Sequence, residues 1–427
     1  MDLAQRLDEL KELGLHRRMR LVSGPQGPRV VLDGKPVLLL CSNNYLGLAD
    51  HPRVREAAAD AAMRWGVGAG SSRVASGTMT VHRRLEERLA AFSRTSAALL
   101  FGSGYLANVG VVSALAEAGG AVLCDELGHA SLADGCALSR AEALRYRHGD
   151  LDHLAALLQQ TAGRPALVVT DSVFATDGDV APLEDLVELC RRYGARLLVD
   201  EAHAIGCLGP GGRGAVAEAG LEGEVDVVIG TLGKALGSYG AYVACDGPTA
   251  RFLASRARTL LASTAPPPPA VAGALAALEL LREQPHRVEK LQANADVLRA
   301  GLAREGFETA GSTTQIVSIV VGDATLALRV CEAALDRGVL AEPVRAPTVA
   351  PGTARVRLAV MASHTKDELR DAARVLGRAA LQAGFRPGAG EPVAAATTLP
   401  ATATATATAA PPRPFDGEAQ AEIARAA

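Results

Sequence analysis

Three side chains that follow two apolar runs have the types and spacing needed for covalent chemistry through an amine. The run Leu197–Val199 leads into Asp200 and His203, and the run Val227–Ile229 leads into Lys234. Apolar runs of this length are typical of buried strands, and the ligands of parallel sheets bind where such strands end. We therefore expect a carboxylate, an imidazole and an amine at one edge of one sheet.

This combination meets the chemical needs of pyridoxal phosphate. Asp200 can keep the pyridine nitrogen protonated, which makes the ring an electron sink. His203 can hold the phenolic oxygen, and Lys234 can supply the amine that forms a Schiff base. Thr231 offers a hydroxyl for the phosphate, and Gly233 lets the backbone approach the ring. The spacing thus predicts a pyridoxal-phosphate enzyme with its cofactor on Lys234.

A competing hypothesis concerns the same acidic motif. Asp200-Glu201-Ala202-His203 is also typical of the metal-binding strand end of certain helicases. Those proteins need an upstream G-x-x-x-x-G-K-[ST] loop for the phosphates of the nucleotide. The chain contains no such loop, and Gly233-Lys234-Ala235 comes after the acidic motif and lacks the hydroxyl. The helicase hypothesis is therefore rejected.

A second group of candidates lies upstream. Gly102-Ser103-Gly104 forms a glycine turn between an apolar run and a helical pattern. The backbone N–H groups at the start of a helix attract anions, so this turn is a candidate phosphate site. His129 follows the next apolar run and is placed where it could stack on a planar ring. A lone histidine after a strand is more often structural, so only its position makes His129 a candidate for contact with the cofactor.

The candidates need a sheet to bring them together, and the apolar pattern predicts one. From about Val37 onward, short apolar runs alternate with helical patterns, which indicates an α/β fold with a mostly parallel central sheet covered by helices on both faces. A long helical stretch, 270–305, follows a proline run and leads into a smaller C-terminal αβ domain. The expected strands are 97–101, 121–124, 166–170, 196–199, 225–229 and 241–245, and the clearest helices are 81–92, 151–160 and 183–193.

Four segments follow from this pattern. Residues 1–43 form an N-terminal helix and arm, 44–265 a large cofactor-binding domain, 266–385 a small domain with its linking helix, and 386–427 a tail. The tail alternates alanine and threonine between prolines, a composition that cannot bury a core and predicts disorder. Its last residues could form a short helix, either as a docking tag or as a dispensable end.

The bulk composition narrows the class of protein. With 44 basic and 47 acidic residues, a net charge of −3 and no large basic block, neither nucleic acid nor an acidic membrane surface is an expected partner. Seven scattered cysteines without a C-x-x-C pair argue against a disulfide framework or a metal site and fit a reducing cytoplasm. The uncharged stretches 95–116 and 261–278 are interrupted by glycine or proline, so no membrane span is expected.

Taken together, the motifs closely resemble those of the α-oxoamine synthases, pyridoxal-phosphate enzymes of fold type I. The resemblance covers about Leu10 to Phe385 and implies a fold type I transferase. The matching segments are Asn43–Leu48, Ser76–Thr78, Gly104–Tyr105, His129–Ser131, Val173–Phe174, Asp177–Gly178, Asp200–His203, Thr231–Lys234 and Ser263–Pro267.

The resemblance implies a role for each matching residue in binding the cofactor. Lys234 would be the Schiff-base lysine and proton carrier, and His129 would stack on the ring and contact substrate. Asp200 would pair with the ring nitrogen and His203 with the phenolic oxygen. The implied phosphate contacts are Gly104, Tyr105 and Thr231, joined by Thr264 of the partner subunit in a homodimer.

The resemblance also implies substrate contacts and an activity. Arg357 would receive the amino-acid carboxylate, with Arg17, Asn43 and Thr348 as further substrate contacts. The region 345–357 resembles the members that condense L-alanine with a pimeloyl thioester in biotin biosynthesis. The implied reaction is a decarboxylative condensation by an acyltransferase, with coenzyme A or an acyl carrier protein presenting the acyl group.

Four departures from the family's pattern keep a second activity open. Ala175 stands where a serine is usual, and Gly128, Ala204 and Ala346 replace asparagine, glycine and proline. Loss of one hydrogen bond at Ala175 changes cofactor affinity by ~1 kcal/mol, which favours weaker binding over lost catalysis. Another α-oxoamine synthase activity, using glycine, serine or a different acyl thioester, therefore stays open. A non-catalytic scaffold is the third hypothesis, and retention of Lys234 with its partners argues against it.

Overall fold

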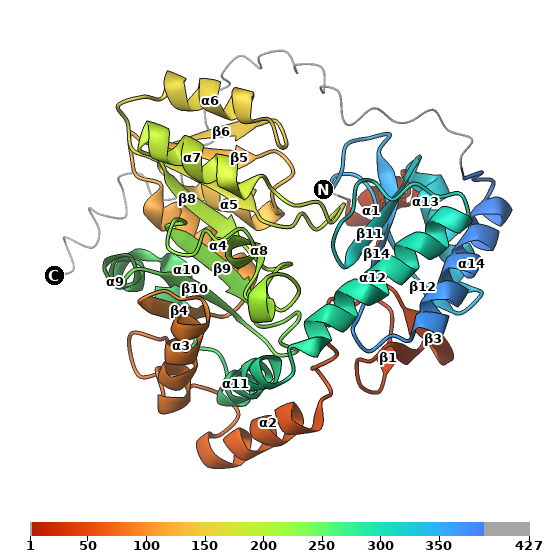
Figure 1. Cartoon of the computed structure of the whole chain (residues 1–427), viewed down its shortest axis with the longest axis horizontal. Coiled ribbons are helices and arrows are strands. Elements are labelled where there is room, and N and C mark those ends of the chain that lie inside the picture. The colour runs from red at the N-terminus through yellow and green to blue at the C-terminus, as the bar shows by residue number, and fades with distance from the viewer. Residues whose placement is uncertain (1, 388–427) are drawn as a thin grey trace. The chain divides into compact units, whose positions relative to one another are not determined.

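The functional candidates lie on a seven-stranded sheet in the computed structural model, which describes residues 2–387 (Figure 1). The tail predicted for 386–427 lies, beyond residue 387, outside the described residues. The strands, in their order across the sheet, are β4 (Ala97–Phe101), β10 (Ala241–Cys245), β9 (Val227–Thr231), β8 (Arg196–Asp200), β7 (Ala166–Asp171), β5 (Ala121–Asp125) and β6 (Glu142–Tyr146).

Strand direction confirms the predicted parallel sheet. The neighbours from β9 to β6 pair in parallel, and only β10 runs against its two neighbours, β9 and β4. The carboxyl ends of the other six strands consequently meet at one edge. Two details of the prediction were wrong. The strand expected at 225–229 runs from Val227 to Thr231, and β6 was missed because four of its five residues are not buried.

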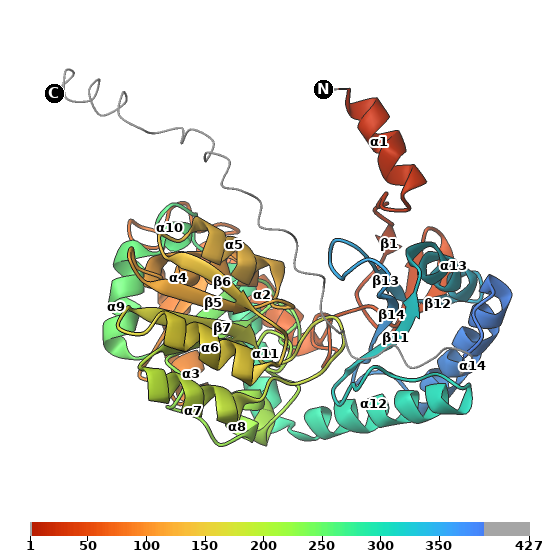
Figure 2. The same cartoon turned by 90° about the horizontal axis from the view of Figure 1, so that it is seen from above.

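Helices cover both faces of this sheet because alternate residues of each strand point to opposite faces. Leu167 and Val169 of β7 pack in one apolar cluster, whereas Val168 between them packs in another. The first cluster lies under α4 (Gly104–Leu115), α5 (Ala130–Leu138), α9 (Gly247–Arg256) and α10 (Arg258–Leu261). The second lies under α2 (Pro52–Trp65), α3 (Thr80–Phe92), α6 (Leu151–Gln160), α7 (Leu183–Tyr193), α8 (Ala215–Glu218) and α11 (Pro268–Glu283) (Figure 2).

A smaller antiparallel sheet lies in the C-terminal third of the described chain. Its strands are β11 (Ile316–Gly322), β14 (Ala354–Ala359) and β13 (Glu342–Val344), with β14 in the centre. Apolar residues of α12 (His286–Arg304), α13 (Ala324–Leu335) and α14 (Lys366–Ala383) are buried with those of β11 and β14. The helix expected over 270–305 is two helices, α11 and α12, because Pro285 lacks the N–H that would continue the first.

The N-terminal arm pairs with this C-terminal region, which the sequence did not indicate. Strands β1 (Val22–Ser23), β2 (Arg29–Leu32) and β3 (Lys35–Leu39) form a meander, and β3 pairs in parallel with β12 (Val339–Leu340). By contrast, α1 (Leu3–Glu12) buries none of its residues. The domain boundaries at 43 and 265 stay predictions.

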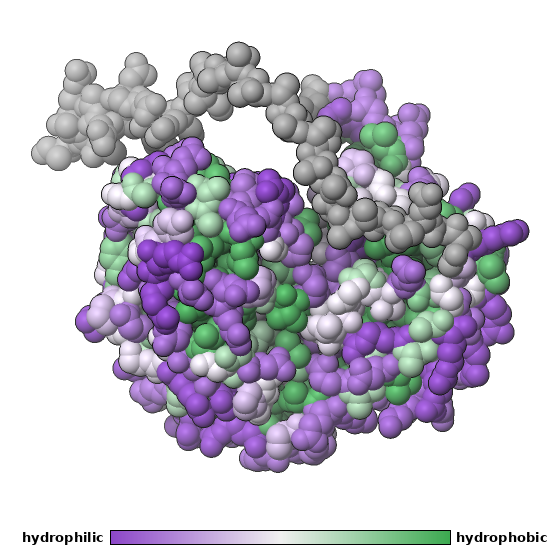
Figure 3. Space-filling model, turned by 45° about the horizontal axis from the view of Figure 1, so that its top comes forward, coloured by the Kyte–Doolittle hydropathy of each residue, from purple (hydrophilic) through white to green (hydrophobic). Residues whose placement is uncertain are grey.

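The described surface gives no sign of a membrane-spanning helix. Between residues 2 and 387, every helix is too short or too polar to cross a bilayer. The face shown in Figure 3 is mostly hydrophilic, with smaller hydrophobic areas between the polar side chains.

Candidate active site

A line of hydrogen bonds joins Lys234 to Arg357 across the two sheets. Nζ of Lys234, in the turn after β9, lies 2.7 Å from Nε2 of His203. Nδ1 of His203 lies 2.7 Å from the hydroxyl of Tyr45, which donates to Oδ1 of Asn43 at 3.0 Å. Nη2 of Arg357 donates to the same oxygen at 3.3 Å. The amine and the guanidinium are therefore the two ends of one polar network.

The network fixes which nitrogen of His203 carries the proton. Tyr45 has one hydroxyl hydrogen, and it is directed to Asn43, so Nδ1 of His203 must donate to the hydroxyl oxygen. Nε2 is then the acceptor for the amine of Lys234. Burial, together with the charges of Lys234 and Arg357, holds the pKa of His203 well below its usual range, which favours this neutral imidazole.

The amine of Lys234 is adjusted for nucleophilic chemistry near neutral pH. Burial, with a smaller contribution from the charge of Arg357, lowers the pKa of Lys234 to about 8 against the opposing charges of Asp200 and Asp171. An unprotonated amine is the form that attacks an aldehyde or removes a proton from carbon. The lysine therefore reaches its reactive form without a strongly alkaline solution.

Asp200 is held in the floor of the site by a buried amide. Nδ2 of Asn108, on α4, donates to Oδ2 of Asp200 at 2.6 Å and to the hydroxyl of Ser131 at 2.8 Å. The backbone N–H of Ala202 donates to the other carboxylate oxygen at 2.8 Å. Oγ of Ser131 lies 2.6 Å from Nδ1 of His129. One asparagine side chain thus orients both the carboxylate and the histidine predicted to face the cofactor.

A second buried carboxyl group, Asp171, anchors the backbone of His129. Oδ2 of Asp171 accepts from the N–H of His129 at 2.8 Å, and Asp171 is the cross-strand neighbour of Asp200. Burial and the charge of Asp200 raise the pKa of Asp171 well above its usual range. Burial lowers the pKa of His129, although Asp200 opposes the shift. A neutral His129 suits the stacking role that the resemblance implies.

Arg357 forms the opposite wall from β14. Its Nε donates to the carbonyl oxygen of Ala175 at 2.5 Å, and its Nη1 donates to Glu342 at 2.9 Å. With the bond to Asn43, these contacts use three of the five N–H groups of a guanidinium. One N–H remains on each terminal nitrogen, which is the arrangement that binds both oxygens of a carboxylate. The side chain is 6% exposed, so such a bond would form in a largely dry site.

The start of α4 has the features expected of the predicted anion site. The N–H groups of Gly104 and Tyr105 belong to the first turn of the helix and have no acceptor one turn back, whereas the Ser103 side chain caps Leu106. A Cβ on Gly104 would meet no atom within 4 Å among the described residues, so space is open beside this backbone. A phosphate-sized anion fits here, the Asp200 carboxylate suits a protonated ring nitrogen, and the Lys234 amine suits an aldehyde. The residues present therefore fit pyridoxal phosphate.

Other predicted site residues lie apart from the network. The side chains of Arg17, Thr348 and Thr264 are exposed, and no hydrogen bond within residues 2–387 joins them to it. Thr264 pairs with Ser72 in an isolated bridge, and Thr231 bonds within its own turn, to Gly240. The predicted roles of these residues remain predictions.

Two residues of the site had no assigned role in the sequence. Tyr45 lies within the motif Asn43–Leu48, and Asn108 lies within the first helix after the glycine turn. A signal existed for Asn108, because an asparagine is unusual in a helix with a mean hydropathy as high as that of α4. Neither the motif that contains Tyr45 nor the unusual asparagine could have shown which partner each side chain bonds.

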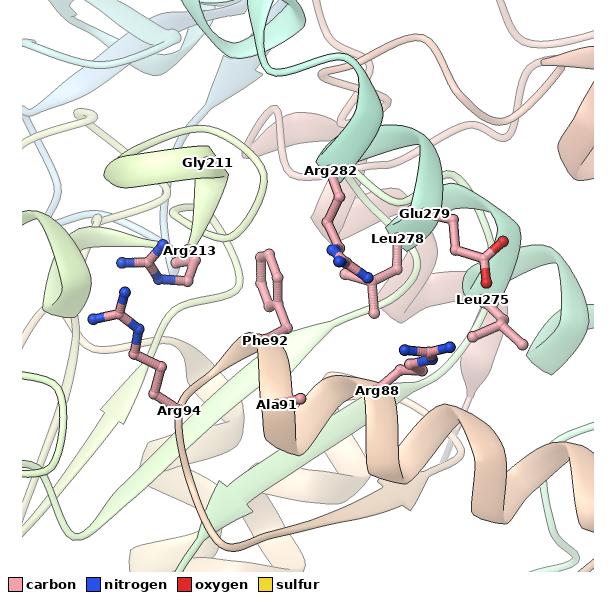
Figure 4. A pocket seen from close by; sticks show the side chains of 10 residues that line it. All are labelled: Arg88, Ala91, Phe92, Arg94, Gly211, Arg213, Leu275, Leu278, Glu279 and Arg282. Atoms are coloured by element: carbon pink, nitrogen blue, oxygen red, sulfur yellow. The ribbon is translucent and has the colours of Figure 1, made fainter.

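An arginine-lined cavity lies elsewhere on the seven-stranded unit. It has a volume of about 410 Å³, and its apolar base is formed by Phe92, Leu275 and Leu278 (Figure 4). Two of its four arginines, Arg94 and Arg213, are already paired with Glu222. No residue of the Lys234 network lines it.

Comparisons with known proteins agree with this site. The model of the aminotransferase class I and II family matches residues 35–376. The chain is 49% identical over 376 residues to the 8-amino-7-oxononanoate synthase of Citrifermentans bemidjiense, covering 87% of this chain and 96% of that protein. It is 50% identical over 381 residues to the 8-amino-7-oxononanoate synthase of Anaeromyxobacter sp. (strain K), covering 89% and 94%.

A solved structure shows the same architecture. Serine palmitoyltransferase from S. paucimobilis, solved with a bound PLP–myriocin aldimine, matches with a TM-score of 0.85 at 32% identity. The match covers 90% of this chain and 97% of that one. The predicted fold type I architecture and the resemblance to α-oxoamine synthases are thereby confirmed. The chain belongs to the aminotransferase class I and II family.

Proposed function

We propose that the chain is an acyltransferase that joins L-alanine to a pimeloyl thioester with loss of carbon dioxide, giving 8-amino-7-oxononanoate for biotin biosynthesis. The observation that carries the proposal is the network with the Lys234 amine at one end and the Arg357 guanidinium at the other. It would provide a proton carrier and a carboxylate receiver for one amino-acid substrate. The identity of 49–50% to synthases of this name supports the choice of reaction.

The residues divide the chemistry between them. When bound, pyridoxal phosphate supplies a protonated ring that stabilises negative charge at the α-carbon of the amino acid. Lys234 would hold the cofactor and then carry the proton from and back to the α-carbon. Asp200, oriented by Asn108, would keep the proton on the ring nitrogen. His129 would stack on the ring.

Arg357 and the neutral His203 complete the arrangement. The two remaining N–H groups of Arg357 would bind the carboxylate of L-alanine and orient its α-carbon. The α-carbon then bonds to the acyl carbon, the thiol leaves, and the carboxyl group departs as carbon dioxide. Because Nε2 of His203 is an acceptor, it can take a hydrogen bond or a proton from a neighbouring oxygen or amine.

A second candidate from the same family has support of its own. The solved structure with the TM-score of 0.85 is a serine palmitoyltransferase, so an activity with L-serine and a longer acyl thioester is an alternative. Ala175, whose carbonyl oxygen holds Arg357, replaces the serine usual in the family. The side chain that tells L-alanine from L-serine would lie in this part of the site.

The assembly and its location complete the proposal. We propose a homodimer in which Thr264 of the partner subunit completes the phosphate site, since Thr264 is exposed here. Coenzyme A or an acyl carrier protein would present the acyl group. A cytoplasmic enzyme fits the seven cysteines, which form no disulfide within the described residues.

A substrate panel tests the proposal. L-alanine, glycine and L-serine are each supplied with pimeloyl, succinyl and palmitoyl thioesters, and release of the thiol is followed. We expect turnover only with L-alanine and the pimeloyl donor, and none in Lys234→Ala. Turnover with L-serine and the palmitoyl donor would favour the second candidate. No turnover of any pair by protein that has bound pyridoxal phosphate would contradict both.

A further inference from the structure

A short hairpin, residues 173–180, stands between Arg357 and the seven-stranded sheet. It follows β7 directly, and its ends are joined by a bridge between Val173 and Val180. Backbone bonds from Phe174 to Asp179 and from Gly178 to Phe174 close its loop. The hairpin is the segment through which the end of β7 reaches β14.

On one side, the hairpin holds the small sheet. Its Ala175 carbonyl oxygen accepts from Nε of Arg357 at 2.5 Å, and its Asp177 forms an ion pair with Arg355. Arg355 and Arg357 are two residues apart on β14 and so share one face of the sheet. Ser318, the neighbour of Arg357 on β11, donates to the carbonyl oxygen of Thr176. The orientation of Arg357 therefore depends on where the hairpin lies.

On the other side, one histidine fixes the hairpin to the large sheet. Nδ1 of His148 lies 3.0 Å from Oδ1 of Asp125, at the end of β5, and Nε2 lies 3.0 Å from Oδ2 of Asp179 in the hairpin. The ring also meets that of Phe174 edge-on, with centroids 4.4 Å apart. The backbone N–H of His148 donates to the side-chain carboxylate of Glu126, which holds the loop that carries the histidine.

His148 is charged in this position. Burial alone lowers its pKa, but the hydrogen bonds and charges of Asp125 and Asp179 outweigh burial and raise the pKa of His148 to about 10. Both ring nitrogens therefore donate at once near neutral pH, so both carboxylates stay bonded. With both nitrogens taken, the ring has no free site to exchange a proton with a substrate. Its contribution is positional.

We propose that His148 is a positioning residue that sets the affinity of the site for the carboxylate of the amino-acid substrate. It acts through Asp179 and the hairpin on the Ala175 carbonyl oxygen that orients Arg357. The inference rests on the proposed function in one respect, that Arg357 binds the amino-acid carboxylate. It adds a residue of the loop after β6 to the machinery of substrate recognition.

The experiment compares His148→Gln and Asp179→Asn with a matched control, His153→Gln. In His148→Gln, the glutamine can bond only one of the two carboxylates. Asp179→Asn removes the negative charge of Asp179 and keeps the size of its side chain. The side chain of His153, on α6, accepts a bond from the N–H of Arg147 and has no hydrogen bond to the hairpin among the described residues. In the holoenzyme, KM for the amino acid and KM for the acyl thioester are measured separately, along with the melting temperature.

We expect both variants to raise KM for the amino acid about 10-fold, the effect of ~1.4 kcal/mol, with KM for the thioester unchanged within about 2-fold. The His153→Gln control should leave both values unchanged. Two outcomes would overturn the proposal by showing that His148 is merely structural. One is an equal increase in the two KM values; the other is a lower melting temperature and a smaller active fraction with both KM values unchanged. If one variant fails to fold, the other carries the same comparison.

A failure of the proposed function is distinguishable from a failure of this inference. In the first case the wild-type enzyme does not turn over L-alanine with a pimeloyl thioester. The variants and the wild-type enzyme are then assayed with whichever small amino acid the wild-type enzyme binds. The change in KM for that amino acid, relative to the change in KM for the thioester, decides the role of His148.

Discussion

The side chains around Asp200 bond to one another within the seven-stranded unit, whereas Arg357 on β14 is held largely by contacts from other segments. Asn108 bonds Asp200 and Ser131 within the large unit, and Ser131 meets His129. Arg357 instead depends on a backbone oxygen of the hairpin and on Asn43, and only its bond to the half-exposed Glu342 comes from its own sheet. We call Asp200, His129 and Lys234 with their bonding partners the floor, and Arg357 with its contacts the wall. The floor is held by residues of its own unit, whereas the wall is held mainly by residues of other segments.

This difference predicts which kinetic property a substitution in each region changes. A change in the floor disturbs the groups that stabilise charge, so it affects the chemical step for every substrate. A change in the wall moves the carboxylate receiver or its neighbours and alters which substrate is preferred. Of the four departures, Ala175 and Ala346 lie on the wall side, in the hairpin and in the loop before β14, whereas Gly128 and Ala204 lie next to His129 and His203.

The largest effect is expected at the floor, from Lys234→Ala. Loss of the amine removes both the covalent hold on the cofactor and the proton carrier, so kcat should fall by roughly 10⁴-fold. Steady-state kinetics with L-alanine and a pimeloyl thioester check this, with circular dichroism to show an intact fold. Activity within about 10-fold of wild type would mean that another group moves the proton.

Arg357→Lys tests the wall. A point charge cannot use both terminal nitrogens, so the carboxylate bond should weaken by about 2 kcal/mol, raising KM for the amino acid roughly 30-fold. KM for the thioester should stay near its wild-type value. A loss that falls on the thioester instead would place Arg357 in the acyl path.

The pH dependence of cofactor capture sharpens the contrast, because the reacting group, Lys234, belongs to the floor. Burial lowers the pKa of Lys234 to about 8, so the amine is protonated and unreactive below that pH. The rate at which the apo protein captures pyridoxal phosphate should therefore rise roughly 10-fold per pH unit below about 8 and level off above it. Stopped-flow absorbance measures the rate. A rise that continues to pH 10 would mean an unperturbed lysine.

Asn108→Ala should cost less than either arginine or lysine replacement. The variant loses two hydrogen bonds but keeps the Ala202 bond to Asp200, so kcat should fall about 10-fold with KM for both substrates little changed. The control is Ser113→Ala on the same helix, whose hydroxyl bonds only within α4. A change confined to KM for the amino acid would assign Asn108 to the wall.

The smallest effect should be a gain, from Glu342→Gln. Glu342 is a carboxylate already bonded to Arg357, so under the proposal its negative charge opposes that of the substrate carboxylate. Because this carboxylate is about half exposed, its removal should lower KM for the amino acid only about 2- to 5-fold. Glu332→Gln on α13 serves as the control. An increase in KM would show that Glu342 orients Arg357 instead of competing for it.

Much of the floor could be predicted from the sequence because local patterns specify it. Asp200, His203 and Lys234 follow buried apolar runs, and parallel strands necessarily bring such residues to one edge. Tyr45 could be quoted as part of a motif but not placed, since its partner His203 lies 158 positions away. Long-range side-chain pairs of this kind leave no periodic trace.

The wall was less predictable for the same physical reason. Arg357 could be assigned through the resemblance, but its hold on the hairpin joins residues 182 positions apart. His148 is an ordinary histidine in a polar loop, and only the fold brings it between Asp125 and Asp179. The pairing of β3 with β12 likewise depends on the tertiary fold.

L-alanine labelled in its carboxyl carbon tests the central claim most directly. The holoenzyme is supplied with this substrate and a pimeloyl thioester, and the products are analysed by mass spectrometry. The account predicts that the label leaves as carbon dioxide, one for each thiol released, and that the aminoketone carries none. Label retained in the coupled product, or recovered in pyruvate without thiol release, would contradict it.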